Sequence, residues 1–200
     1  MVVQPRTLTQ VQAGMRYLHD IGVRRFEPSL DLWADWSTAD AQTLEETIGA
    51  IADFWAAGIP ETSITWFDER AAMLSRAPVE VSARCGFGSG EIAVSPAGNL
   101  YPCERLVADD LDSNPMRLPG HVLIGNDFLA GLRPEGALPD ECSPCALRSC
   151  CSTRSCYCSN YIRTGVVSRP DRLLCLFDQL CYRETSRVLG RMAIPCSVGA

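Results

Sequence analysis

Six of the eleven cysteines lie within the seventeen residues 142–158, in the run CSPCALRSCCSTRSCYC. Cys85 and Cys103 precede this run, and Cys175 follows it. Cysteine side chains can form disulfides, coordinate zinc or hold iron–sulfur clusters, and each use leaves a different pattern in a sequence. This is the sharpest chemical signal in the chain, so the use of these thiols decides the function.

The pattern argues against disulfides. Eleven is an odd number, and the adjacent residues Cys150 and Cys151 would make a strained bridge. The opening residues MVVQPRTLTQ lack the basic and then apolar segments of a secretory signal, so we expect a cytoplasmic protein with reduced thiols.

Zinc is an alternative that the sequence leaves open. Cys142-x2-Cys145 is a suitable half-site, and reduced thiols would be free to bind the ion. A zinc ribbon needs a second C-x2-C pair, which the sequence lacks, and His19 and His121 are the only histidines. We expect both histidines to be ordinary surface or core residues.

Iron–sulfur clusters fit the number and grouping of the cysteines best. A [4Fe–4S] cluster takes up to four thiolates from a loop that wraps around it, so about eight ligands would hold two clusters. Five arginines near the run could offset the negative charge of a fully ligated cluster, or could simply form a solvated surface. They are Arg148, Arg154, Arg163, Arg169 and Arg172.

Composition argues against other classes of function. The 200 residues carry a net charge of −6, which disfavours nucleic-acid binding through phosphate neutralisation. The 46% apolar content suits a buried core, yet no apolar run approaches the length of about eighteen residues that marks a transmembrane helix. We therefore expect neither nucleic acid nor a membrane as a partner.

The first 84 residues contain no cysteine and have the pattern of a βα-repeating fold. Apolar spacing predicts a helix over 8–22, a short strand over 23–30 and a second helix over 37–58. Ser37 or Thr38 would cap the second helix. A closed (β/α) barrel needs roughly 200 residues or more, so we expect this region to be the end of a larger partial barrel.

The residues after position 84 predict a different kind of secondary structure. Residues 90–103 alternate on either side of a turn at Gly98 and predict a β-hairpin, in which Gly98 can adopt a positive φ. A strand that continues into a short helix is expected over 121–132. Residues 171–192 predict a helix, capped by Asp171. Its inward side would carry Leu174, Phe177, Cys181 and Val188.

The cysteine spacing resembles the SPASM domain, the C-terminal iron–sulfur extension of radical S-adenosylmethionine enzymes that modify peptides and proteins. The shared pattern is Cys85-x12-Gly98-x4-Cys103, a long gap, Cys142-x2-Cys145-x5-Cys151-x4-Cys156, another gap and Cys175. The segments VSPAGNLYPC, HVLIGND and CYCSNYIRTG are similar to the same family. The family has three residues where this chain has four between Cys151 and Cys156, so the roles of Cys150, Cys156 and Cys158 stay open.

The resemblance implies an α/β chain in two parts. Residues 1–78 would be the last βα units of a partial TIM-like barrel from a radical S-adenosylmethionine enzyme. Residues 79–192 would be a small, cysteine-rich α+β domain of SPASM type, and residues 193–200 a loose tail.

The resemblance also implies two auxiliary [4Fe–4S] clusters. Cluster I would take Cys85, Cys103 and Cys156, with Cys158 as the alternative or additional ligand. The ligands of cluster II would be Cys142, Cys145, Cys151 (or Cys150) and Cys175. Cys181 is expected to be a buried helix residue, and Cys196 an incidental thiol of the tail.

By resemblance, the complete enzyme would use S-adenosylmethionine and a third [4Fe–4S] cluster, held by a C-x3-C-x2-C loop, to modify a ribosomally made peptide or protein. No two cysteines here lie four positions apart, so the chain lacks that loop and is expected to be inactive alone. Expected partners are the peptide or protein substrate, a separate N-terminal barrel fragment, and a reductant such as flavodoxin or ferredoxin. A stand-alone electron carrier or interaction module without catalysis is the alternative.

Overall fold

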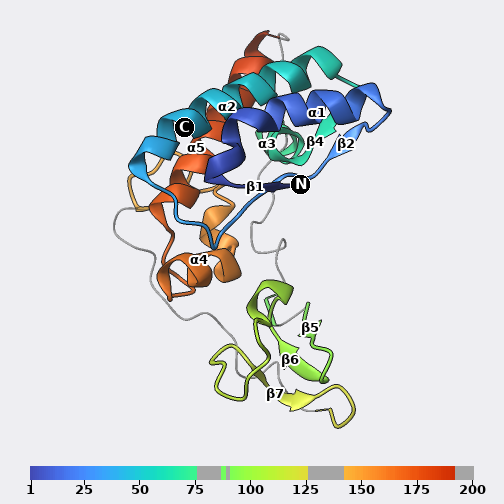
Figure 1. Cartoon of the computed structure of the whole chain (residues 1–200). Helices are drawn as coiled ribbons and strands as arrows, with labels where there is room; N and C mark the ends of the chain where they lie inside the picture. The colour runs from blue at the N-terminus through green and yellow to red at the C-terminus, as the bar shows by residue number, and fades with distance from the viewer. Residues whose placement is uncertain (76–86, 89–90, 126–141, 192–200) are drawn as a thin grey trace. The chain divides into compact units, whose positions relative to one another are not determined.

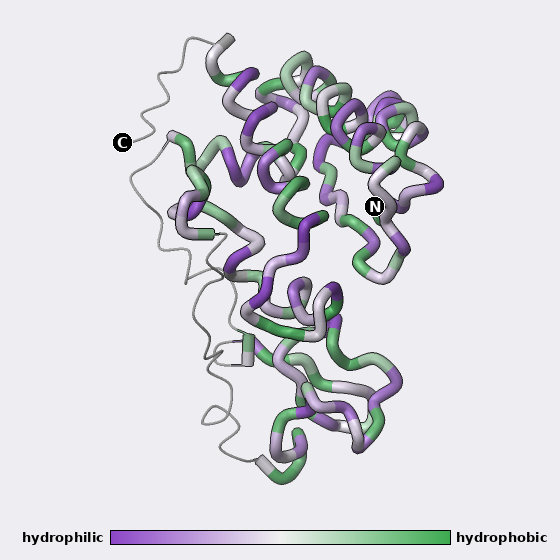
Figure 2. Tube along the Cα trace, turned by 90° about the vertical axis from the view of Figure 1, so that its left-hand side faces the viewer, coloured by the Kyte–Doolittle hydropathy of each residue, from purple (hydrophilic) through white to green (hydrophobic). Residues whose placement is uncertain are grey.

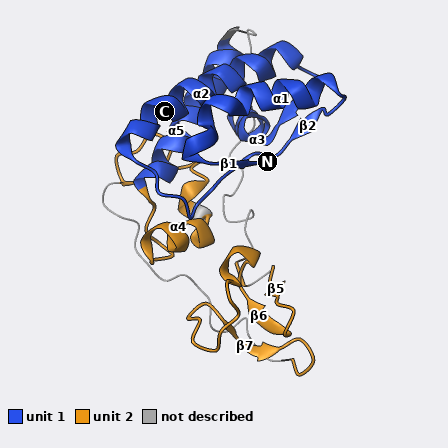
Figure 3. Ribbon diagram, in the orientation of Figure 1, with its two compact units in different colours: residues 1–79, 172–200 blue, residues 80–171 orange. Residues whose placement is uncertain are grey.

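The computed structural model describes residues 1–75, 87–88, 91–125 and 142–191, so Cys85 and Cys196 lie outside the described residues. The chain forms two compact units, residues 1–79 with 172–200 and residues 80–171, which Figure 3 distinguishes by colour. The last long helix thus belongs to the first unit, whereas the predicted domain 79–192 includes it. The division into domains 1–78, 79–192 and 193–200 rests on the family resemblance and stays a prediction.

The first unit contains short parallel strands. They are β1 (Val2–Val3), β2 (Arg25–Phe26), β3 (Ser29–Leu30) and β4 (Ser63–Ile64). β1 pairs with β3, and β2 pairs with β4, so the segment 25–30 lies between the other two strands. The strand predicted over 23–30 is interrupted before Ser29, because Pro28 has no amide hydrogen to donate to a ladder. Within the part of the chain that the structure describes, the strands do not close into a barrel.

Helices connect and cover these strands. They are the 3₁₀ helix η1 (Pro5–Gln10), α1 (Val11–Asp20), α2 (Thr38–Gly58), α3 (Thr65–Leu74) and α5 (Arg172–Arg191). α2 packs against both α1 and α5, an arrangement that Figure 1 shows from the side. Hydrophilic and hydrophobic residues alternate along these helices in Figure 2, as expected for helices with one buried face. None of the helices in the described residues combines the length and the apolarity needed to cross a membrane.

The prediction for α2 is confirmed closely. Ser37 is its N-cap: the Asp40 amide donates to the Ser37 hydroxyl, and the Ser37 amide donates to the Asp40 carboxylate. This reciprocal arrangement satisfies two amide groups that the first turn would otherwise leave unpaired. Its apolar residues Leu44, Ile48 and Ile51 are completely buried. The helix predicted over 8–22 is shorter, because its first residues form η1 and the α-helix ends at Asp20.

A buried ion pair joins α3 to α5. The Arg70 guanidinium donates through Nε to the Asp178 carboxylate at 3.2 Å, and both side chains are at least 94% buried. Arg70 also donates to the Trp66 carbonyl at 2.7 Å and lies over the rings of Phe177 and Tyr182. These contacts stabilise the charge of the Arg70 guanidinium, which would be costly to bury without partners. Next to the pair, Cys181 is completely buried, as predicted, and burial raises its pKa to about 12.

The second unit begins with a three-stranded antiparallel sheet of β5 (Ala93–Val94), β6 (Asn99–Tyr101) and β7 (Leu118–His121). β5 and β6 form the predicted hairpin, and Gly98 in its turn has a φ of +87°. A Cβ atom at Gly98 would lie 2.2 Å from His121 Nε2, so only glycine fits this turn. The strand predicted from 121 onward is wrong: β7 ends at His121, and a turn follows it. The short helix expected after that strand lies outside the described residues.

A network of polar side chains braces this sheet. The Asp110 carboxylate accepts hydrogen bonds from the Tyr101 hydroxyl at 2.6 Å and from the Asn99 amide at 3.0 Å. The hydrogen bond from Ser95, followed by those from Tyr101 and Asn99, holds the pKa of Asp110 below its usual range. Burial, strengthened by the bond to Asp110, raises the pKa of Tyr101 to about 12. This network fixes β6 immediately before Cys103.

A short helix, α4 (Tyr157–Thr164), completes the described part of the second unit; the sequence did not predict it. The side-chain amide of Asn160 donates to the carbonyls of Thr153 and Val167 at 3.1 and 3.2 Å. Thr153 lies in the 3₁₀ helix η6 (Thr153–Ser155), directly before α4. The buried Asn160 side chain thus ties the segments on both sides of α4 to the helix itself.

We predict that the Arg70–Asp178 pair is essential to the stability of the first unit. Asp178→Ala leaves a buried guanidinium without its carboxylate, so the free energy of unfolding should fall by about 3–5 kcal/mol. The double variant Arg70→Met with Asp178→Leu should lose less, because it removes both charges. Denaturant unfolding of the full chain measures each change.

The exposed pair Arg25–Glu27 provides the control, since its side chains are 71% and 64% exposed. Glu27→Ala should change the free energy of unfolding by less than about 1 kcal/mol. Equal losses for Asp178→Ala and Glu27→Ala would contradict the prediction.

The Tyr101–Asp110 bond predicts a specific alkaline destabilisation. In the unfolded chain, tyrosine releases its proton near a pKa of about 10. Folded Tyr101 keeps its proton up to a pKa of about 12. The neutral Tyr101 hydroxyl therefore stabilises the folded state fully at pH values below the tyrosine pKa of the unfolded chain. This stabilisation is lost as the pH rises through the pKa of folded Tyr101. The stability advantage of the wild-type chain over Tyr101→Phe should narrow across this range, measured by unfolding at a series of pH values. Tyr17→Phe, at an exposed position, should show no such trend; a constant Tyr101→Phe difference would refute the prediction.

Candidate metal centre

Three cysteines that the family resemblance assigns to cluster I meet in the second unit. Cys103 follows β6 and is the N-cap of the 3₁₀ helix η3 (Glu104–Leu106), while Cys156 and Cys158 lie at the start of α4. The Sγ atoms of Cys156 and Cys158 are 3.8 Å apart, and Cys103 packs against the same buried cluster as Cys158. The fold thereby brings together thiols that are more than fifty positions apart in the sequence.

An apolar shell surrounds these thiols. Phe87, Leu106 and Cys158 form its buried centre, and the Phe87 and Tyr157 rings lie 5.2 Å apart. Half-buried side chains complete the shell: Cys103, Met116, Cys156, Tyr157, Tyr161, Ile162 and Val167. Phe87 lies two positions after Cys85, the remaining proposed ligand of cluster I, which is outside the described residues. Such a shell limits the access of water to the sulfur atoms.

Three polar side chains lie against the sulfur atoms: Arg105, Ser159 and Glu104, whose carboxylate accepts from the Cys103 thiol at 3.2 Å. Arg105 Nη1 is 4.0 Å from Cys158 Sγ and 3.3 Å from Ser159 Oγ. Ser159 Oγ lies 2.9 Å from Cys156 Sγ, so the hydroxyl stands between the guanidinium and this thiol. Sequence reasoning did not single out Arg105 or Ser159, because their role depends on a long-range contact. Their only local signal is that each lies within three positions of a proposed ligand.

The thiols have unequal acidities. The interaction between the Cys103 and Cys158 thiols lowers the pKa of Cys103 and raises the pKa of Cys158. The pKa of Cys156 is raised by its contact with Cys158 and by burial. A bound metal or cluster would require these thiols as thiolates.

The donor set suits a soft metal or an iron–sulfur cluster. Three sulfur atoms lie in one apolar shell, with a guanidinium beside them to offset negative charge. In the described part of the chain, however, no three His, Cys, Asp or Glu side chains are already arranged around a single metal ion. The thiols therefore suit a metal or cluster by their chemistry and their surroundings. The number of clusters stays unassigned.

The proposed cysteines of cluster II lie in a run of tight turns. The Cys145 amide donates to the Cys142 carbonyl at 3.3 Å, and the Cys150 amide donates to the Leu147 carbonyl at 3.0 Å. Cys142, Cys145, Cys150 and Cys151 are all partly exposed. Cys175 is also partly exposed, but it lies on α5 in the first unit.

The two histidines have other contacts. His19 Nε2 lies 3.1 Å from the Thr62 hydroxyl, and the His19 ring packs edge-on against Phe54. His121 Nε2 lies 2.8 Å from the Ala97 carbonyl, where it closes the hairpin turn. Both side chains therefore help to hold the fold.

Comparison with known proteins finds similarity in fold. No family model matches the chain, and no curated protein matches it. A solved structure of hexahistidine-tagged anSMEcpe with bound AdoMet has a TM-score of 0.60 and 16% identity, and covers 96% of this chain and 52% of that chain. Native anSMEcpe with bound AdoMet and the Cp18Cys peptide has a TM-score of 0.56 and 16% identity, with 96% and 55% covered.

This chain spans about half the length of those structures. anSMEcpe is an anaerobic sulfatase maturase of the radical S-adenosylmethionine class with a SPASM domain. At such low identity the similarity concerns the fold alone. The chain has the mixed helix-and-strand fold found in the matching half of this SPASM-domain radical enzyme.

Proposed function

We propose that this chain is the iron–sulfur-binding C-terminal portion of a radical S-adenosylmethionine enzyme with a SPASM domain, which modifies a ribosomally made peptide or a protein. Its own task is to hold two auxiliary [4Fe–4S] clusters. The observation that carries the proposal is the meeting of Cys103, Cys156 and Cys158 in one apolar shell. The fold shared with anSMEcpe supports the assignment to this class.

Cluster I would be held by Cys85, Cys103, Cys156 and Cys158. Both cysteines of α4 lie in the shell, which supports their use together rather than as alternatives. Four thiolates would leave no iron open for direct binding of a substrate. Cluster I would therefore transfer single electrons, the chemistry that such a cluster supplies.

Cluster II would be held by Cys142, Cys145, Cys151 (or Cys150) and Cys175. The partial exposure of these cysteines supports a cluster that exchanges electrons near the surface. The run of turns over 142–150 provides a loop of the kind that can wrap around a cluster.

The chain's own residues would prepare the first site for its cluster. The apolar shell around Phe87 and Leu106 excludes water, and Ser159 and Arg105 orient and polarise the sulfur atoms. The braced β6 strand fixes Cys103, and Asn160 fixes α4. Preorganised ligands of this kind hold a cluster in one geometry while its charge changes.

The remaining parts of the proposal concern the complete enzyme. It would use S-adenosylmethionine and a third [4Fe–4S] cluster bound by a barrel segment, which this chain could receive from a separate fragment. The first unit supports this, because β1 pairs only with β3 among the described strands. A cytoplasmic protein, a reductant such as flavodoxin or ferredoxin, and a peptide or protein substrate complete the proposal; the peptide-bound anSMEcpe structure supports the last of these.

The rival function is an iron–sulfur electron carrier or interaction module without catalysis. Recovery of turnover after mixing with a barrel fragment would favour the enzyme, whereas two stable clusters and no response to any such fragment would favour the rival. A zinc scaffold is the third possibility. It would yield colourless protein with bound zinc after assembly with both metals.

We predict that anaerobic reconstitution of the full chain gives brown protein with about eight iron and eight sulfide atoms. Cys103→Ala and Cys158→Ala should each remove about four of both, because one cluster loses a ligand. Cys142→Ala should cause a loss of the same size, and combining it with Cys103→Ala should leave almost no iron. Iron and sulfide analysis with EPR spectroscopy measures these changes.

Cys181→Ala and Cys196→Ser are the controls, since both thiols lie outside the proposed ligand sets. They should leave the iron content unchanged. Reconstituted protein without a cubane EPR signal, or with the same iron content in the Cys103, Cys142 and Cys181 variants, would refute the proposal. Cys150→Ala compared with Cys151→Ala identifies the ligand of cluster II.

A further inference from the structure

We propose that Arg105 and Ser159 are positioning residues that raise the reduction potential of cluster I. This inference rests on the proposed function, because it concerns the cluster that Cys103, Cys156 and Cys158 would hold. It assigns a role to two residues that are not themselves ligands. The contacts of each residue with the sulfur atoms support it independently.

Arg105 brings a positive charge to the thiols. It follows Cys103 by two positions in η3, and its guanidinium reaches across to α4, with Nη1 4.0 Å from Cys158 Sγ. The side chain is 35% exposed, so water only partly screens its charge. Glu104 forms an ion pair with Arg105 Nε at 3.8 Å, and its other carboxylate oxygen accepts from the Cys103 thiol at 3.2 Å. The guanidinium therefore acts mainly on Cys158, whereas the carboxylate acts on Cys103.

Ser159 supplies a hydrogen bond to the other α4 thiol. Its hydroxyl lies 2.9 Å from Cys156 Sγ. Ser159 is 95% buried, so water does not compete for this bond. Arg105 donates to the same hydroxyl at 3.3 Å, which orients the hydroxyl proton toward Cys156. The two residues thus act together on two adjacent sulfur atoms.

The direction of the effect follows from charge. One-electron reduction makes a [4Fe–4S] cluster with thiolate ligands more negative, so a nearby cation stabilises the reduced form more than the oxidised form. Hydrogen bonds to the sulfur atoms act in the same direction. Both residues should therefore make cluster I easier to reduce. Because arginine remains charged at all accessible pH values, its contribution should be constant with pH.

A purely structural role for Arg105 makes a different prediction. If the side chain served only to link η3 to α4, its loss would lower iron content or stability without moving the potential of the clusters that remain. Lysine can restore the charge but cannot reproduce the planar guanidinium. Arg105→Lys and Arg105→Gln therefore separate charge from shape.

The test is an EPR-monitored redox titration of the reconstituted full chain with mediators. The signal of cluster I is identified by its absence in Cys103→Ala. Arg105→Gln should reduce the equilibrium constant for one-electron reduction about tenfold, which corresponds to a decrease of ~59 mV. Arg105→Lys should retain most of the wild-type potential. Ser159→Ala should lower the potential by a smaller amount, because it removes a neutral hydrogen-bond donor and no charge.

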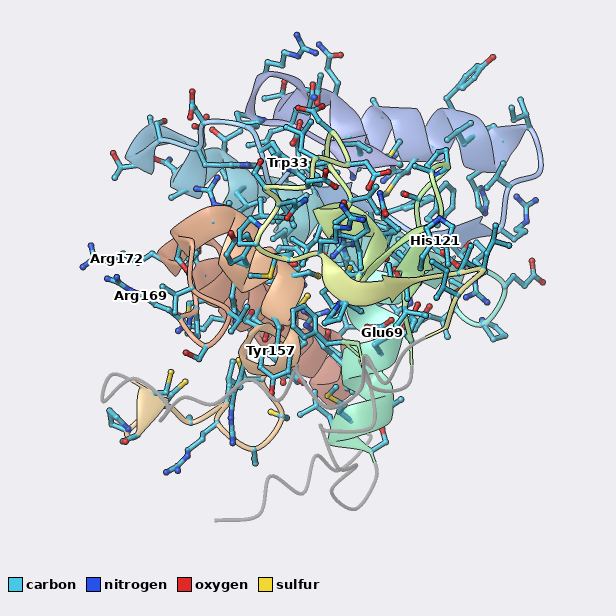
Figure 4. The ribbon with its side chains drawn as sticks, turned by 90° about the horizontal axis from the view of Figure 1, so that it is seen from below. Trp33, Glu69, His121, Tyr157, Arg169 and Arg172 are labelled. Carbon is cyan, nitrogen blue, oxygen red and sulfur yellow. The ribbon has the colours of Figure 1, made fainter. Side chains whose placement is uncertain are left out.

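Arg169→Gln is the matched control. It removes the same charge from the same unit, and Figure 4 shows the Arg169 side chain extending away from the ribbon. Its potential should change much less than that of Arg105→Gln, since Arg169 is exposed and its charge is screened by water and salt.

Two results would overturn the inference. One is an unchanged cluster I potential in Arg105→Gln at full iron content; the other is an equal decrease in Arg105→Lys and Arg105→Gln. Failure of the wild-type chain to assemble a cluster would instead refute the proposed function. If Arg105→Gln assembles too little cluster to titrate, the Ser159→Ala potential decides: a value equal to wild type overturns the inference.

Discussion

The contact between thiols from distant segments is the constraint on which the second unit depends. Its apolar centre is small, with Phe87, Leu106 and Cys158 buried together, and the surrounding chain consists largely of turns. So few apolar side chains release little free energy on burial, while joining segments this far apart costs conformational entropy. The sulfur atoms of Cys103, Cys156 and Cys158 lie at this small apolar centre, where additional bonds would stabilise the unit. Bonds to a cluster would serve as its core.

The first unit is stabilised in a different way. Parallel strands, a capped α2 and a packed α5 bury a continuous apolar interior, and the one buried charge pair described here, Arg70–Asp178, is surrounded by aromatic rings. A pair of this kind contributes less to net stability than to specificity, because only the correct placement of α5 brings the carboxylate to the guanidinium. The chain thus combines a conventional core with a unit organised around thiols.

The predictions succeeded where structure is local. Helix α2 and the hairpin were predicted because a cap, a repeated apolar spacing and a turn glycine lie within a few residues of each other. The strand predicted from 121 failed because pairing depends on a partner: β6 is only three residues long, and β7 ends at His121, opposite the first residue of β6, Asn99. The short helix α4 was missed because its residues are mostly polar and its stability comes from Asn160 and the thiol contacts.

The amino-acid sequence by itself determined the kind of chemistry open to this protein. The number of cysteines, their spacing and the turn at Gly98 are local properties, and they indicate metal or cluster ligation wherever the chain places them. Only the tertiary structure decided that both Cys156 and Cys158 meet Cys103, and that Arg105 and Ser159 lie against them. The reason is physical: contacts between residues fifty positions apart depend on how η3 packs against α4, and no local pattern encodes that packing.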